Sequence, residues 1–174
     1  MATPERPPFI AHWSEIEKPE ADRYDQDDEL MSIGASFGRS LGLTKLGIHH
    51  ERLLPGRRTS FPHAESAEEE FVYVIEGEPD VWLDGHLHPL RPGDAVGFPA
   101  GTGIAHSFLN NTQREVHLLV VGEKTKPENR IVYPLHAHRK ALHAWWDEAP
   151  ARALGPHDGM TDQVRAAKAG REGD

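Results

Sequence analysis

The 174-residue chain contains no cysteine. Disulfide bonds, thiolate nucleophiles and zinc–thiolate sites are therefore excluded, and any bound metal must be held by His, Asp or Glu. Long apolar runs are also missing, since stretches such as "HLLVVG" are too short to span a bilayer. The opening "MATPERPPFI" lacks the basic start and apolar stretch of a signal peptide. We therefore expect a cytoplasmic protein.

Positive charge is scarce, with 19 Lys and Arg against 28 Asp and Glu and a formal net charge of -9. Residues 1–30 alone hold nine acidic against three basic residues, so most of the net charge lies there. No stripe of Lys or Arg is interleaved with aromatic residues, as nucleic-acid binding would favour. The composition predicts no nucleic-acid or membrane partner, and a small molecule as the ligand.

The centre of the chain has the pattern of an all-β fold. From Leu43 to Gly122, short runs rich in β-branched and aromatic residues alternate with turn residues every eight to twelve positions. Asp84-Gly85 predicts a two-residue hairpin turn. The expected strands are "KLGIHHERLL", "EFVYVIEG", "DVWL", "HLHPL", "AVGFP", "AHSFLN" and "VHLLVV". Strands this short must pack as two sheets or close into a barrel to bury their inner faces.

Three segments are expected. Residues 1–42 form an acidic N-terminal arm with an edge strand, and residues 43–122 form the barrel. Residues 123–174 form a C-terminal extension with a short helix within residues 136–148, which carries Trp145 and Trp146, and a polar tail with one or two helical turns. We expect the two tryptophans to anchor the extension to the barrel or to a second subunit.

Two stretches resemble the signature motifs of the cupin superfamily, which are small barrels of the double-stranded β-helix type with a jelly-roll-like form. They are "PGRRTSFPHAESAEEEFVYVIEG" and "PGDAVGFPAGTGIAHSFLN". The matching positions are His63, Glu70 and Gly77 in the first motif and Gly93, Pro99, Gly101, His106 and Asn110 in the second. The chain departs from the motif at position 65, where a second histidine is replaced by Glu65. The chain is most similar to small single-domain bacterial cupins.

The resemblance implies one divalent metal ion bound by His63, Glu70 and His106. Residues 63 and 65 lie two apart on an extended segment, so their side chains share one face. Glu65 is therefore either a fourth ligand or a base beside the ion. Imidazole together with carboxylate suits Fe, Mn, Ni, Co or Zn. A cation would also relieve the repulsion between Glu65 and Glu70 inside an apolar barrel.

Further candidates precede the first motif. Alternation along a strand places His49 and Glu51 on one face and His50 on the other, and the sequence does not decide which face lines the cavity. His49, His50 and Glu65 are the candidate catalytic bases.

Two arginines, Arg57 and Arg58, adjoin the first motif, where they can bind a substrate carboxylate or phosphate. A solvated turn is the alternative interpretation for this pair.

The resemblance leaves the reaction open, because cupins include isomerases, dioxygenases, decarboxylases, lyases and binding proteins. The leading hypothesis is a mononuclear metal enzyme that acts on a hydroxy acid, a keto acid or a sugar derivative. Isomerase or lyase chemistry would need a base, whereas Fe would allow dioxygenase chemistry. The alternative is a non-catalytic, metal-dependent binder of a small molecule. The resemblance also implies a homodimer, for which the N-terminal arm and the Trp-bearing extension would supply the interface.

Overall fold

The computed structural model describes residues 6–171. The strands are β1 (Ile33–Ser36), β2 (Leu46–Leu53), β3 (Ala64–Glu65), β4 (Glu70–Glu76), β5 (Asp80–Leu83), β6 (His86–Pro89), β7 (Ala95–Phe98), β8 (His106–Leu109), β9 (Val116–Glu123) and β10 (Ile131–Val132). The helices are α1 (Trp13–Ile16), α2 (Phe37–Ser40), the 3₁₀ helix η1 (Ala137–Ala141) and α3 (Asp162–Arg171). Within residues 6–171, the helices are all too short or too polar to cross a membrane.

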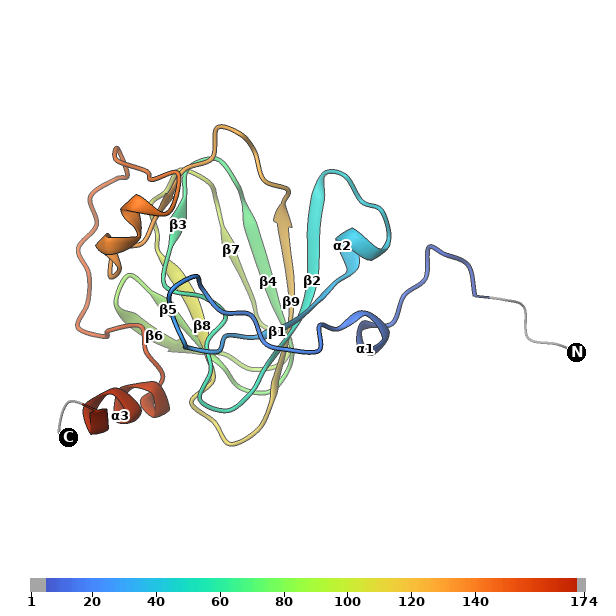
Figure 1. The fold of residues 1–174 in the computed structure, drawn as a ribbon, viewed down its shortest axis with the longest axis horizontal. Helices are drawn as coiled ribbons and strands as arrows, with labels where there is room; N and C mark the ends of the chain where they lie inside the picture. The colour runs from blue at the N-terminus through green and yellow to red at the C-terminus, as the bar shows by residue number, and fades with distance from the viewer. Residues whose placement is uncertain (1–5, 172–174) are drawn as a thin grey trace, which may run out of the picture.

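Antiparallel sheets curve around a common interior (Figure 1). The largest sheet has the order β1-β2-β9-β4-β7, and a three-stranded sheet with the order β6-β5-β8 lies opposite it. The short pair β10-β3 closes one end. Apolar side chains from both larger sheets meet in one core, which contains Val72, Val81, Phe108 and Leu118. The prediction of an all-β barrel is confirmed.

Two turns of the barrel contain the residues that the sequence motifs predict there. Asp84 and Gly85 join β5 to β6 with φ angles of 44° and 89°, as the predicted hairpin turn requires. Asn110 follows β8 and is fully buried. Its side-chain amide donates to the carbonyl oxygens of Leu53 and Arg114, at 2.8 and 2.7 Å. The motif asparagine thus joins three segments of the barrel wall and takes no part in the cavity.

The N-terminal arm, defined here as residues 17–32, crosses the open side of the barrel before β1 pairs with β2 (Figure 1). Tyr24 stacks on Phe61, with ring centroids 4.3 Å apart. Glu29 accepts two hydrogen bonds from the buried guanidinium of Arg58, at 2.7 and 2.8 Å. The arm is therefore a wall of the barrel interior, although its composition is strongly polar.

The C-terminal extension returns to the barrel largely without regular structure. Trp146 packs against the cluster around Trp82, and Trp145 packs against the cluster that contains Phe61. The expectation that these tryptophans anchor the extension is confirmed for the barrel. The expected helix within 136–148 is limited to η1, because backbone hydrogen bonds between Ile131 and residues 144 and 146 hold that part of the chain extended.

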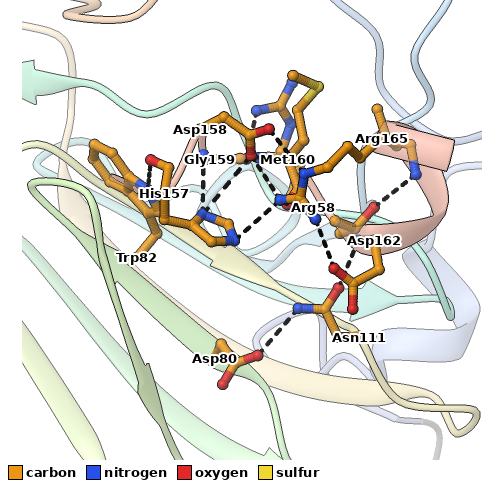
Figure 2. A network of polar contacts seen from close by, with 12 residues as sticks. Arg58, Asp80, Trp82, Asn111, His157, Asp158, Gly159, Met160, Asp162 and Arg165 are labelled. Carbon is orange, nitrogen blue, oxygen red and sulfur yellow. Dashed lines mark hydrogen bonds and ion pairs between the residues drawn. The ribbon is translucent and has the colours of Figure 1, made fainter. Parts of the chain in front are cut away.

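The last described helix, α3, is tied to the barrel by a polar network (Figure 2). The indole N–H of Trp82 donates to the carbonyl oxygen of His157 at 2.9 Å. Arg165 binds both carboxylate oxygens of Asp158, at 2.9 and 2.7 Å. This pairing holds the pKa of Asp158 down at about 2. The helix is longer than the one or two turns expected from its composition.

Candidate active site in the barrel interior

The barrel interior contains a cavity of about 320 Å³. The imidazole and carboxyl side chains of His63, Glu70, His106 and Glu51 line this cavity. Its apolar walls include Val72, Phe108 and Val120. The arm contributes Asp22, Arg23, Tyr24, Met31 and Ser32. The cavity thus lies between the inner faces of the two larger sheets and is covered by the arm.

Three of the side chains predicted from the motifs lie side by side. His63 and His106 are linked by a β-bridge, with their backbones exchanging hydrogen bonds of 3.2 and 2.9 Å, and their rings are 4.8 Å apart. Nε2 of His106 lies 3.2 Å from Oε1 of Glu70, the first residue of β4. Phe98 stacks on the ring of His106 with centroids 3.5 Å apart, which fixes the plane of that imidazole. Rigid strands therefore position two imidazoles and one carboxylate together.

The hydrogen bonds of this cluster define its charge state. Nδ1 of His63 lies 3.0 Å from the carbonyl oxygen of Phe61, which can only accept, so Nδ1 carries the proton and Nε2 keeps its lone pair. Burial and, to a smaller extent, the neighbouring His106 lower the pKa of His63 to about 4, so this imidazole is neutral near pH 7. Burial alone would raise the pKa of Glu70, but the hydrogen bond from His106 and the nearby imidazoles bring it below its usual value. Glu70 is therefore a carboxylate.

A fourth ionisable group, Glu51, faces the same cavity from β2. Its side chain is 15% exposed and accepts a hydrogen bond from the hydroxyl of Ser32 on the arm. Burial raises the pKa of Glu51 to about 7, although the Ser32 bond acts in the opposite direction. A Cβ at position 34 would lie 3.2 Å from Oε1 of Glu51, so Gly34 leaves room for the carboxyl group. Glu51 can accept or donate a proton near neutral pH.

Comparison with known proteins identifies the central part of the chain. The Cupin_2 family model, a cupin domain, matches residues 49–122. Residues 49–122 form a cupin domain. A solved sugar phosphate isomerase from a cupin superfamily, from Silicibacter pomeroyi, is 36% identical. It superposes with a TM-score of 0.57 over 59% of this chain and 64% of its own.

Two Streptomyces proteins are similar over shorter stretches. The polyketide synthase CurC of Streptomyces cyaneus is 32% identical over 93 residues, which are 53% of this chain and 56% of that protein. Protein SchB of Streptomyces halstedii is 40% identical over 65 residues, which are 37% of this chain and 45% of that protein. The chain thus spans about half of the length of these relatives.

The donors of this cupin domain fit a metal ion in chemical type. Two neutral or neutralisable imidazoles and a carboxylate are ligands for first-row divalent metals. The Phe61 carbonyl orients His63 as a second-shell acceptor commonly does for a ligating imidazole. Among residues 6–171, however, no three His, Asp or Glu side chains are arranged to hold an ion as they stand. The contact between His106 and Glu70 occupies Nε2, so a metal ion would have to replace the proton that these two groups share.

Glu65, which stands where the motif has a histidine, lies beside this cluster on β3. It borders a small pocket with His63, Glu70 and His106 but does not line the main cavity. Burial, together with the charges of Glu68 and Glu70, raises the pKa of Glu65 to about 7. The structure brings Glu65 to the cluster without placing it where a substrate in the cavity would lie.

The two histidines of β2 are separated as the alternation requires. His49 lies on the inner face beside Glu51, with Nδ1 3.9 Å from Oε1. His50 points to the other face, where it stacks on Trp13 of α1 at 4.5 Å and contacts Nδ1 of His117 through Nε2 at 3.1 Å. His50 is therefore not a catalytic candidate, and that prediction is wrong because the strand turns the side chain away from the cavity.

The prediction of a substrate-binding arginine pair is also wrong for Arg58. Arg58 is fully buried, and its guanidinium is used by Glu29 and by the carbonyl oxygen of Gly159 at 2.7 Å. Arg57 is half-buried and lies outside the cavity lining, with NH1 3.4 Å from the carbonyl oxygen of Met31. The positive charge at the cavity comes from Arg23 of the arm. The sequence gives no local signal for this role.

Proposed function

We propose that the cavity is the active site of a metal-dependent cupin enzyme that transfers a proton next to a carbonyl group of a small oxygenated molecule. The observation that carries the proposal is that one cavity is lined by four side chains that can serve as metal ligands or as a base. They are His63, Glu70 and His106, which would hold the ion, and Glu51, which is separate from this cluster. An enzyme needs an ionisable side chain that is not used by the metal, whereas a binding protein needs only a shaped pocket.

Glu51 is the proposed base. Its pKa of about 7 allows it to take a proton from a substrate carbon and to return it at a neighbouring position. The Ser32 hydroxyl holds one oxygen of the carboxyl group in place, and His49 lies beside the other side of the group. A divalent ion bound at His63, Glu70 and His106 would supply Lewis-acid polarisation of a carbonyl oxygen.

The walls of the cavity limit the class of substrate. A volume of about 320 Å³ suits a small molecule. Asp22, Glu51 and Glu70 bring negative charge to the lining, against the single cation Arg23. This balance favours an uncharged hydroxycarbonyl compound over a multiply charged anion. An isomerase or lyase reaction fits this arrangement better than a reaction that depends on strong anion binding.

The first test is elemental analysis of untagged protein purified without chelator. We expect about one Fe, Mn, Ni, Co or Zn ion per chain. The ion should be lost in His106→Ala and retained in His88→Ala, a matched control whose imidazole is exposed on β6. Retention in Glu65→Ala would assign Glu65 a role beside the ion, and loss would make it a ligand. A wild-type protein that contains no metal and takes up none on reconstitution would overturn the metal site.

The second test addresses proton transfer. The metal-loaded protein is incubated with dihydroxyacetone in deuterated water, and the loss of carbon-bound protons is followed by proton NMR. We expect exchange that is slowed at least about 100-fold in Glu51→Gln, as general-base removal commonly does. Metal content must be the same in both proteins. Equal exchange rates in the two proteins would exclude Glu51 as the base.

A further inference from the structure

Among the residues whose burial the structure describes, two arginines are buried, and they differ in how their charge is compensated. Arg58 is fully buried and forms an ion pair with Glu29 at 2.7 Å. Arg139 of η1 is only 2% exposed, but it forms no ion pair with any carboxylate of residues 6–171, and its Nε has no hydrogen-bond partner there. A buried, unpaired charge costs several kcal/mol. The described residues therefore leave the buried Nε–H of Arg139 without an acceptor and its charge without a carboxylate.

The surroundings of Arg139 cover the faces of its guanidinium. Its central carbon lies 4.4 Å from the ring centroid of Tyr24, 5.1 Å from that of Phe61 and 5.8 Å from that of Tyr133. Cation–π contacts of this kind stabilise the charge from above and below the plane. They do not satisfy the N–H groups, which point along the plane and need acceptors.

Two imidazoles near Arg139 have the same deficiency. Nδ1 of His136 and Nε2 of His143 are buried without a hydrogen-bond partner among the described residues. His136 stacks on Phe61 at 4.2 Å, and His143 lies 5.2 Å from the ring of Tyr133, so both belong to the same aromatic cluster as Arg139. Burial lowers the pKa of each imidazole, and the charge of Arg139 contributes in both cases. A neutral imidazole can still donate one hydrogen bond.

We propose that Arg139, His136 and His143 bind a small oxyanion, of the phosphate or carboxylate class, at the seam between the N-terminal arm and the C-terminal extension. The Nε–H of Arg139 and the one N–H that each neutral imidazole can present match the acceptor-only oxygens of such an ion. Asp25 is near enough to act on the charge of His143 but forms no ion pair with Arg139. This site is separate from the barrel cavity, whose lining includes none of these three residues.

Occupancy of this site would affect the arm. Arg139 and His143 belong to the extension, whereas Tyr24, against which Arg139 packs, belongs to the arm and lines the cavity. An anion bound to Arg139 would offset the cost of burying its charge beside Tyr24, and so help to hold the arm over the cavity. The proposal does not depend on the metal site or on the reaction of the cavity.

The test is isothermal titration calorimetry of the metal-free full chain with inorganic phosphate, in a buffer without oxyanions and with ionic strength held by sodium chloride. We expect binding of one phosphate per chain by the wild type and none by Arg139→Met. Arg114→Met is the matched control, because Arg114 is 79% exposed, and it should bind phosphate like the wild type. A parallel titration with acetate distinguishes a phosphate site from a carboxylate site.

A second variant keeps the test decisive if Arg139→Met does not fold. His143→Phe retains a ring beside Tyr133 and removes one donor, so we expect roughly tenfold weaker binding, the value of a hydrogen bond to a charged group. Far-UV circular dichroism confirms that each variant is folded. Wild-type protein that binds neither phosphate nor acetate overturns the proposal. So does unchanged binding in a folded Arg139→Met variant or, where that variant is unfolded, in His143→Phe.

Discussion

Glu51 shows at the scale of one residue how the fold changes a side chain's chemistry. In water its carboxyl group would be ionised well below neutral pH. Burial against the arm raises its pKa to about 7. Between about pH 4.5 and 7, the folded protein therefore keeps a proton on Glu51, whereas the unfolded chain has released it. Stability from this group is present at acidic pH and falls as the pH rises through this window.

The corresponding variant is Glu51→Gln. The amide keeps the shape of the side chain and cannot ionise, so we expect the metal-free variant to be more stable than the wild type by about 3 kcal/mol at pH 8 and equal to it near pH 4.5. Urea unfolding at several pH values measures the difference. Glu76→Gln, at an exposed position on β4, is the control. Glu65, whose pKa is also raised to about 7, should leave part of the pH dependence in the variant. Parallel pH profiles for wild type and Glu51→Gln would contradict the burial effect.

The sequence predicted some of these residues and not others, for physical reasons. His63, Glu70 and His106 belong to motifs whose spacing reflects the barrel itself, and the structure brings them together. Glu51 was placed on one face of its strand by alternation, but only the three-dimensional fold shows that this face is the inner one. Arg58 was predicted to bind a substrate anion. Its true partner, Glu29, lies 29 positions earlier, and no local pattern shows such a pairing.

At the scale of elements, the N-terminal arm joins the two ends of the described chain above the cavity. Glu29 binds Arg58, which also donates to the carbonyl oxygen of Gly159 in the extension. Tyr24 packs between Phe61 and Arg139. The arm carries much of the negative charge of the protein, yet buried cations of the barrel and the extension hold it in place.

Glu29→Gln tests this attachment. The amide leaves the Arg58 guanidinium buried with reduced compensation, so we expect a loss of about 3 kcal/mol of unfolding free energy. Glu20→Gln, which removes the same charge from an exposed position of the arm, should change stability little. Chemical denaturation gives both values. A Glu29→Gln variant as stable as Glu20→Gln would show that the ion pair does not hold the arm.

The regular elements were predicted more reliably in the barrel than in the extension. The run from Phe71 to Ile75 is visible in the sequence as β-branched and aromatic residues before a turn, although only the structure shows that Val72 and Val74 point inward and Phe71 and Tyr73 outward. The extension has no run of this length. Residues 144–146 are extended because they bond to Ile131, a contact that depends on where the barrel places that residue.

For the whole molecule, the outer face of β4 is the surface that the fold leaves uncovered. Phe71, Tyr73 and Ile75 are 44%, 38% and 45% exposed in a row along this strand. A net charge of -9 opposes association of two copies unless they meet through an uncharged surface. We propose that this apolar stripe pairs two copies of the chain, as the resemblance to cupins implies. The N-terminal segment, which was predicted to supply the interface together with the extension, pairs through β1 with β2 of its own chain.

Size-exclusion chromatography with light scattering tests this arrangement. We expect the mass of a dimer for the wild type and the 19.4 kDa mass of a single chain for Tyr73→Lys, because a charge at the centre of the stripe would be buried on pairing. His88→Lys places a charge on an exposed strand of the other sheet and should remain dimeric. A monomeric wild type would exclude pairing, and a dimeric Tyr73→Lys would place the interface elsewhere.

The joining of the two chain ends above the cavity also has a consequence for biosynthesis. The last strand of the large sheet ends at Glu123, but two groups that complete the attachment of the arm are made later: Arg139, which packs on Tyr24, and the carbonyl oxygen of Gly159, which accepts from Arg58. At about 5–20 residues per second, translation from Glu123 to Gly159 takes roughly 2 to 7 seconds. During this interval the arm is held by Arg58 and Phe61 but lacks its contact with Arg139. The cover of the cavity is therefore completed last, after the strands that line the cavity have been made.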